Sequence, residues 1–182
     1  MPKHPEHLSE DEPSILSQEF AEGILRQAKQ NLKKDGALSP MLFLQFKEGE
    51  GGIVPLDLPD THEERAEYFA VIGATFQSQG KVIEEALFLS DTWYVSAEGE
   101  GRLSLDVAPS KHPKRREAIT IIGRDAQRTR YTMVVQVYGR DRQHQPVFEP
   151  PALAEYNIFG TPTSGPVGLL DHLFAKRSRL LN

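Results

Sequence analysis

The chain contains no cysteine, and this absence excludes several kinds of chemistry together. Disulfides, cysteine-ligated zinc, iron–sulfur clusters and a thiolate nucleophile all need that side chain. The sequence also has no run of about 18 apolar residues that would span a bilayer. Its first twelve residues are polar and lack the apolar core of a secretory signal. Together these absences predict a cytoplasmic protein that does not enter a membrane.

Catalytic and cofactor motifs are also missing. The sequence has no HExxH or HxH pattern, no GxSxG nucleophile turn and no phosphate-binding Walker loop. The element order is loosely similar to that of zinc deaminases, but the cysteine pair and the HxE pattern they require are absent. His4 and His7 are three residues apart in a proline-containing stretch, and an inert tail is a simpler interpretation than a metal site. We therefore expect no metal and no cofactor.

Charge is unevenly distributed along the chain. The whole sequence carries 21 basic and 26 acidic side chains, a net charge of −5. Residues 1–110 hold 9 basic and 20 acidic side chains, whereas residues 111–142 hold 9 basic and 3 acidic ones. Such a split can give the protein an anionic face and a cationic face. This favours binding of a partner in a defined orientation over catalysis in a buried reaction centre.

Hydrophobic periodicity predicts two long helices in the first half of the chain. Apolar residues recur at helical spacing between Ser17 and Lys34, and Asp35-Gly36 supplies a stop. A second helix is expected over about 62–79, because Thr61 and Glu64 have the spacing of a capping box. Its predicted buried stripe consists of small and aromatic residues: Ala66, Phe69, Ala70, Gly73 and Phe76.

Five apolar segments predict strands, at residues 41–46, 53–58, 86–95, 117–122 and 131–138. The first two and the last two read as hairpins. Segment 86–95 is apolar on both faces and is expected in the centre of the sheet. Residues 96–114 are polar and predict a long excursion.

This order predicts an α+β fold, with a mostly antiparallel sheet of about five strands and two helices on one face. Three regions are expected. Residues 1–13 form a flexible N-terminal arm and residues 14–142 a single α+β domain. Residues 143–182 form a Pro-rich extension that ends in a short amphipathic helix, at about 166–181.

Four short motifs within residues 20–140 resemble a family of uncharacterised prokaryotic proteins: Lys33-Lys34-Asp35-Gly36, Pro40 to Leu44, Ser90 to Trp93, and Ser110 to Glu117. The chain has Asp91-Thr92 where a more acidic residue followed by alanine is typical. The resemblance implies a single compact domain and carries no activity with it.

Seven cations within residues 111–130 form the strongest candidate for a binding surface: Lys111, Lys114, Arg115, Arg116, Arg124, Arg128 and Arg130. They flank a predicted strand about 20 Å long, so they form one patch only if the later arginines lean back along the sheet. Two readings stay open at this stage: a partner-binding face, or solvated loops and internal pairing with the acidic half.

Two further features have alternative interpretations. Asp91 lies in an apolar strand and needs a partner if it is buried, which favours a structural pair with an arginine or lysine over a catalytic base. The apolar residues of the C-terminal helix, among them Leu169, Leu173 and Phe174, either pack on their own domain or dock into a partner's groove.

The leading hypothesis is a non-enzymatic interaction or assembly protein. It would engage protein partners, including copies of itself, through its C-terminal extension and basic loops. A nucleic-acid accessory factor that uses residues 111–130 is the first alternative. A small enzyme centred on Asp91 and His112 is the second.

Overall fold

The computed structural model describes residues 13–95, 109–161 and 166–175 of the 182-residue chain. Two α-helices, seven strands and two 3₁₀-helices occur in these ranges. In chain order they are α1 (Gln18–Asp35), β1 (Met41–Phe46), β2 (Gly51–Pro55), α2 (His62–Ser78), β3 (Ile83–Tyr94), η1 (Pro109–Lys111), β4 (Arg116–Asp125), β5 (Arg130–Arg140), β6 (Pro146–Phe148), β7 (Leu153–Phe159) and η2 (Pro166–Leu173).

All strands belong to one antiparallel sheet with the order β2-β1-β3-β4-β5-β6, and β7 also pairs with β5. Because β4 occupies one edge of β5, both β6 and β7 pair along its other edge, at opposite ends of the strand. The predicted α+β class with an antiparallel sheet is confirmed, and segment 86–95 lies in a central strand as expected.

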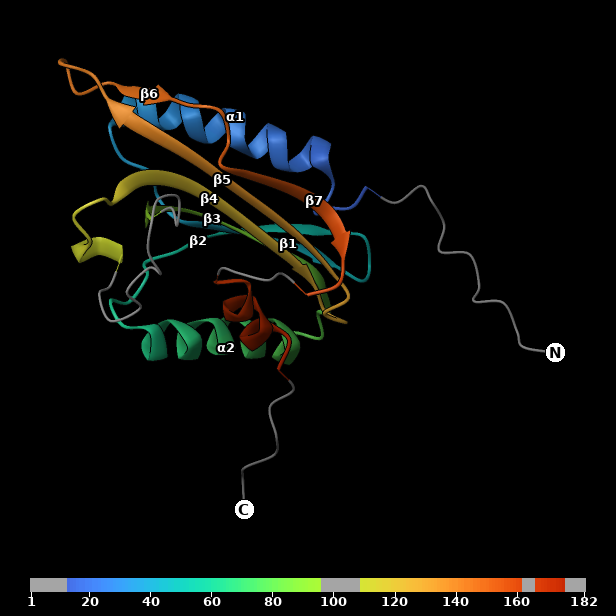
Figure 1. Cartoon of the computed structure of the whole chain (residues 1–182). Coiled ribbons are helices and arrows are strands. Elements are labelled where there is room, and N and C mark those ends of the chain that lie inside the picture. Colours follow the sequence, from blue (N-terminus) through green and yellow to red (C-terminus); the bar gives the residue numbers. More distant parts are fainter. Residues whose placement is uncertain (1–12, 96–108, 162–165, 176–182) are drawn as a thin grey trace.

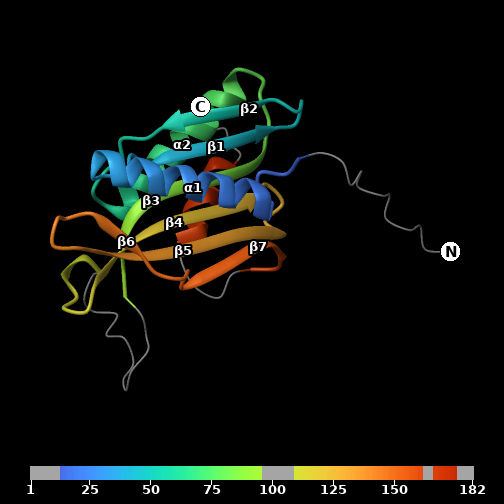
Figure 2. The ribbon, with the colours of Figure 1, turned by 90° about the horizontal axis from the view of Figure 1, so that it is seen from above.

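The helices cover both faces of the sheet. Figure 1 shows α1 on one side of the strands and α2 with η2 on the other. In Figure 2, β1 and β2 lie to one side of α1, and β5 to β7 lie to the other. One core cluster joins α1 to one sheet face through Leu25, Leu87 and Ile119. A second joins α2 and η2 to the opposite face through Phe69, Phe88 and Leu170.

The prediction of two helices on one face is therefore wrong. In β4 and β5 nearly every residue is buried, so side chains that point to either face of the sheet are apolar. A single helical layer would leave Leu87, Ile119 and Ile121 in water. Each face therefore needs its own cover, and the first two helices divide between them.

The strand count also differs, with seven strands where about five were expected. The two additional strands, β6 and β7, come from residues that the sequence places in the Pro-rich extension. Pro150 and Pro151 lie between them, where the ladder along β5 is interrupted. The C-terminal helix is a 3₁₀-helix that ends at Leu173. Most of the expected N-terminal arm, most of the excursion at 96–114 and the last residues of the predicted C-terminal helix lie outside the described residues.

Local sequence signals account for the ends of both α-helices. The Ser17 side chain accepts a hydrogen bond from the Phe20 amide at the start of α1, and Gly36 ends the helix in the left-handed conformation. Thr61 and Glu64 form the predicted capping box at the start of α2. No helix of the described residues is long and apolar enough to cross a membrane.

The helix α2 and η2 approach each other closely at Gly73. A Cβ atom at this glycine would lie 2.2 Å from the carbonyl oxygen of Leu173. That distance is far below van der Waals contact, so η2 rests on this turn of α2 only because the side chain is absent. The contact holds the end of the described chain against the core.

We therefore expect Gly73→Ala to destabilise the protein by about 2 kcal/mol or more, because backbone must move to make room. Alanine is the better helix former by roughly 0.5–1 kcal/mol, so helix propensity alone would predict that Gly73→Ala stabilises the protein. Gly23→Ala in α1 is the matched control, since its nearest contact would lie 3.9 Å away. Urea unfolding measures both variants. A Gly73→Ala protein as stable as Gly23→Ala would contradict the close contact.

Candidate functional site

The basic residues singled out in the sequence divide between the two ends of β4. Arg116 begins the strand, and Lys111, Lys114 and Arg115 precede it. Arg124, Arg128 and Arg130 lie at the other end, around the β4–β5 turn. The structure therefore does not bring the seven cations together into one patch.

The three arginines at the β4–β5 turn are engaged inside the fold. Arg124 and Arg128 place their Nε atoms 3.0 and 3.5 Å from Oδ1 of Asp171, which belongs to η2. Arg130 Nη2 donates to Glu85 Oε1 at 2.8 Å. These contacts attach η2 and β3 to the turn, so this end of the sheet is neutralised by internal pairing.

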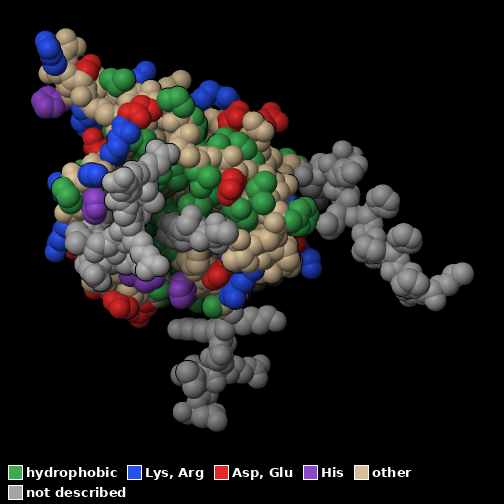
Figure 3. Space-filling model, in the orientation of Figure 1, with side chains coloured by type: hydrophobic (Ala, Val, Ile, Leu, Met, Phe, Trp, Pro, Cys, Tyr) green, Lys and Arg blue, Asp and Glu red, His purple; other side chains and the backbone are tan. Residues whose placement is uncertain are grey.

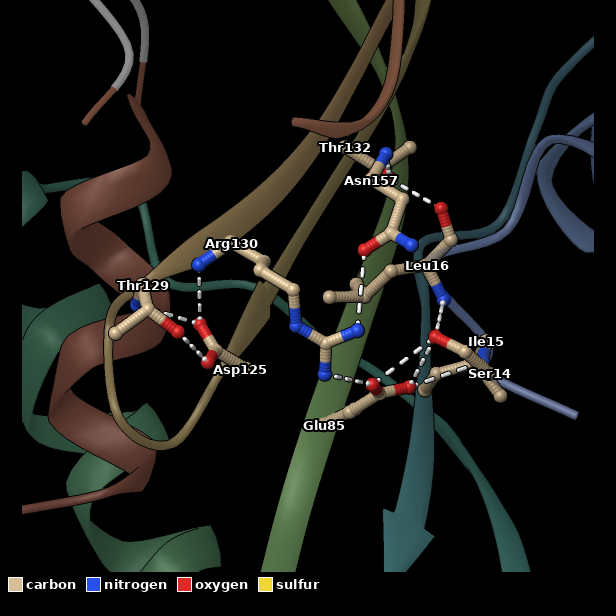
Figure 4. A network of polar contacts seen from close by, with 9 residues as sticks. All are labelled: Ser14, Ile15, Leu16, Glu85, Asp125, Thr129, Arg130, Thr132 and Asn157. Carbon is tan, nitrogen blue, oxygen red and sulfur yellow. Dashed lines mark hydrogen bonds and ion pairs between the residues drawn. The ribbon is translucent and has the colours of Figure 1, made fainter. Parts of the chain in front are cut away.

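Glu85 is the centre of a polar network that fastens the N-terminal segment to the sheet (Figure 4). Its carboxylate is almost fully buried and accepts hydrogen bonds from the Ser14 hydroxyl, the Ile15 amide and Arg130. A buried carboxylate with this many donors is well compensated. Sequence reasoning missed Glu85, because the expected strand began at residue 86 whereas β3 begins at Ile83.

Two neighbouring groups extend this network across the sheet. Buried Asp125 accepts from the amides of Thr129 and Arg130 at 2.8 and 2.7 Å, which fixes the β4–β5 turn. The Thr132 hydroxyl donates to the Leu16 carbonyl and accepts from the Asn157 amide of β7 (Figure 4). The network therefore joins residues 14–16 to β3, β5 and β7, and its role is structural.

A second polar cluster lies on the α1 face at the opposite end of the central strands. The Tyr138 hydroxyl donates to Asp91 Oδ1 at 3.0 Å. Arg140 forms two hydrogen bonds with the Glu117 carboxylate, at 2.9 and 3.0 Å. The direct partner of Asp91 is thus a tyrosine, where the sequence favoured an arginine or lysine.

The environment of this cluster shifts two pKa values upward. Partial burial raises the pKa of Asp91, the Tyr138 hydrogen bond opposes this effect, and the nearby Glu117 charge adds to it. Burial and the adjacent Asp91 charge raise the pKa of Tyr138 above its ordinary value. Tyr138 therefore remains a neutral hydrogen-bond donor at physiological pH.

Three chain segments carry cations at this end of the sheet (Figure 1), and we call this region the basic end. It comprises Lys29, Lys33 and Lys34 of α1, residues 111–116, and Arg140 and Arg142 at the β5–β6 turn. Arg140 Nη2 donates to the carbonyl of Gly36, directly after α1, which places the end of that helix beside the turn. In Figure 3 several Lys and Arg side chains lie along this side of the molecule, at the left.

Two aromatic rings belong to the basic end. Trp93 at the end of β3 is 41% exposed, and the guanidinium of Arg115 lies 4.8 Å from its ring centre. Lys29 and Lys33 both approach the ring of Phe148, at 5.1 and 5.7 Å. These cation–π contacts hold the charged groups over apolar surface without neutralising them.

Among the described residues, only two cations of the basic end form an ion pair with a carboxylate. Glu149 pairs with Arg116, and Glu117 pairs with Arg140. Within residues 13–95, 109–161 and 166–175, seven other cations of this region form no ion pair: Lys29, Lys33, Lys34, Lys111, Lys114, Arg115 and Arg142. Sequence reasoning missed the α1 lysines as surface residues, because it treated Lys33 and Lys34 only as the end of the first helix.

The apolar C-terminal residues pack within the chain itself. Leu169 and Leu173 are buried in the core that also contains Phe69, and Phe174 is partly buried against it. These three residues were candidates for partner binding, and the described part of this region instead covers one face of its own sheet.

Asp91 and His112 have different hydrogen-bond partners in the part of the chain described. His112 Nδ1 accepts a hydrogen bond from the Lys114 amide, whereas Asp91 is bonded by Tyr138. A groove of about 340 Å³ beside α1 is lined by apolar and uncharged side chains such as Ile24, Met41 and Phe43, and by neither of these two residues. Nor do the described residues contain a cluster of three metal-ligating side chains.

The Glu85 network predicts a large stability effect. We expect Glu85→Gln to cost about 2–4 kcal/mol, because Arg130 loses its counter-charge and buried donors lose an ionised acceptor. Glu50→Gln is the control, since Glu50 forms an exposed pair with Lys81 and its loss should cost less than about 0.5 kcal/mol. Chemical unfolding of the two variants tests this. Equal stabilities would show that the network contributes little.

The raised pKa of Asp91 predicts a pH effect of definite sign. The folded state holds this proton to higher pH than the unfolded state does, so ionisation of Asp91 lowers stability as pH rises from about 3.9 toward the raised value. Asp91→Asn removes this loss and keeps an acceptor for Tyr138. Relative to wild type, the variant should gain stability between pH 3.5 and pH 7, as measured by unfolding at each pH. If the Asp91→Asn variant instead lost stability relative to wild type over that pH range, the pKa of Asp91 would not be raised.

Comparison with known proteins adds no functional information about this site. No protein-family model, curated protein or solved structure matches the chain. The resemblance to uncharacterised prokaryotic proteins therefore stays a prediction.

Proposed function

We propose that this protein is a non-enzymatic binding protein that recognises an acidic segment of a protein partner through the basic end. The observation that supports this most is that three chain segments place unpaired cations at the same end of the sheet (Figure 1). Lys29, Lys33 and Lys34 come from α1, Lys111, Lys114 and Arg115 precede β4, and Arg142 follows β5. None of them forms an ion pair with another described residue.

The aromatic groups favour a protein segment as the partner. Trp93 and Phe148 provide apolar contact surface among the cations, and Arg115 and Lys29 lie over their rings. A segment that alternates carboxylates with apolar side chains matches this mixture, since exposed aromatic and arginine side chains often dominate interface energetics.

The acidic groups of the basic end disfavour a nucleic acid. Asp91, Glu117 and Glu149 lie between the cations and hold Tyr138, Arg140 and Arg116 in place. A continuous line of phosphates would pass close to these carboxylates, whereas a peptide can place its charges around them. The net charge of −5 acts in the same direction by repelling a polyanion from the rest of the molecule.

The acidic partner can be a second copy of the same chain. Residues 1–110 carry most of the negative charge of the molecule, so an acidic stretch of one copy has the chemistry that the basic end of another would recognise. Light scattering after size exclusion at low and high salt detects this. Assembly that disappears at high salt identifies the partner as a second copy.

Fluorescence anisotropy with a labelled 16-residue peptide of alternating glutamate and leucine tests the proposal. A 16-nucleotide oligothymidylate of single-stranded DNA serves as the competing probe. We expect the peptide to bind more tightly than the oligonucleotide, and its affinity to fall with salt. Lys111→Ser with Lys114→Ser should weaken peptide binding by about tenfold, since each exposed cation contributes up to about 1 kcal/mol.

Lys47→Ser with Lys81→Ser is the control, because it removes the same charge at the opposite end of β1, from exposed Lys47 and from Lys81, which pairs with Glu50. The control should bind the peptide as the wild type does. Equal losses in the two double variants would show that only net charge matters. Tighter binding of the oligonucleotide would support the nucleic-acid hypothesis instead.

A further inference from the structure

A second, smaller pocket lies on the other side of α1 from the apolar groove, between that helix and the β6–β7 edge of the sheet. Its volume is about 250 Å³. Its polar lining consists of Glu22, Arg26 and Lys29 of α1, Gln136 of β5, Glu149 and Tyr156. Unlike the apolar groove, this pocket is lined by charged groups of both signs.

Gln136 gives this pocket an unsatisfied acceptor. The residue is fully buried, and its Nε2 group donates to the carbonyls of Val137 and Glu149. Those two acceptors fix the orientation of the amide, because the flipped form would point its oxygen at carbonyl oxygens. The remaining atom, Oε1, is buried and has no donor among the described residues. Buried acceptors of this kind are rare and usually have a partner.

The charged residues of the pocket provide complementary sites on either side. Arg26 and Lys29 form no ion pair within the described residues. Burial and the neighbouring Lys33 lower the pKa of Lys29, which a bound anion would reverse. Burial raises the pKa of the Tyr156 phenol, and the charge of Glu22 adds to this effect. The pocket therefore has anion-binding and cation-binding groups around one acceptor.

We propose that this pocket binds a small zwitterion of the α-amino acid type. The ammonium group of the ligand donates to Gln136 Oε1 and faces Glu22, and its carboxylate faces Arg26 and Lys29. This site shares Lys29 and Glu149 with the basic end, but it takes a different ligand and goes beyond the recognition of an acidic partner.

The size of the pocket agrees with such a ligand. A volume of about 250 Å³ lies just below the range of about 300–1,000 Å³ that is typical of drug-sized ligands. It is far larger than the ~30 Å³ that one water occupies in the liquid, so a single bridging water would leave most of it unfilled. A ligand that carries only one sign of charge would leave the groups of opposite sign on one side of the pocket unmatched.

Solution NMR on the ¹⁵N-labelled full chain tests the proposal, with each of the twenty common L-amino acids added singly at 10 mM. At least one of them should shift the side-chain amide signals of Gln136 in a saturable manner. For that amino acid, the N-acetyl derivative and the carboxamide derivative should each bind about tenfold or more weakly, since each lacks one charge.

Two variants locate the binding site. Arg26→Gln should weaken binding by about tenfold without altering the core, because Arg26 is exposed. Gln136→Met should abolish the interaction with the ammonium group, and the backbone amide signals of Arg26 and Lys29 report binding in this variant. Gln27→Met is its control, since Gln27 lies on α1 outside this pocket. The Lys111→Ser and Lys114→Ser variant should bind the amino acid normally, which separates this site from the acidic-partner surface.

Three results would overturn the proposal. The first is that no amino acid shifts the Gln136 signals at 10 mM, which would leave bound water as the occupant. The second is that acetate shifts them as strongly as the amino acid, which would remove the role of the ammonium group. The third is unchanged binding in Arg26→Gln together with Gln136→Met.

Discussion

The central strands are apolar on both faces, and the rest of the structure depends on this constraint. Residues in β4 and β5 are buried almost without interruption, so both sides of the sheet must be covered. The helix α1 covers one face, and α2 covers the other together with η2. The C-terminal segment is thereby part of the core. Leu169 and Leu173 are buried in that core, so they stabilise the domain itself.

The same arrangement separates two kinds of charged residues along β4. At the β4–β5 turn, arginines are paired with Glu85 and Asp171, and the contacts attach η2 and the N-terminal segment to the sheet. At the start of β4, only Arg116 and Arg140 have carboxylate partners among the described residues. Lysines from α1 add to the second group because the end of that helix lies beside the β5–β6 turn. Charges at one end are paired within the fold, and most cations at the other end form no ion pair among the described residues.

The two sides of α1 also differ in chemistry. Toward β1 and β2 it presents Ile24, Gln27 and Asn31, which line an apolar groove without a charged residue. Toward the β6–β7 edge it presents Glu22, Arg26 and Lys29, which line a polar pocket above the buried amide of Gln136. The helix α1 therefore lines both the apolar groove and the polar pocket, and it carries three lysines of the basic end.

The sequence by itself determined the local elements. Helical periodicity and capping residues fixed α1 and α2 almost to their ends, and apolar runs predicted the three central strands, because these signals act within a few residues. Only the tertiary structure decided which face each helix covers, that β6 and β7 extend the sheet, and that Lys29 and Arg142 belong to the same surface as Lys111. It also decided that Arg124 and Arg130 are neutralised, since their partners Asp171 and Glu85 lie more than forty residues away in sequence. Periodicity reports which residues are buried, but it contains no information about which buried surfaces meet.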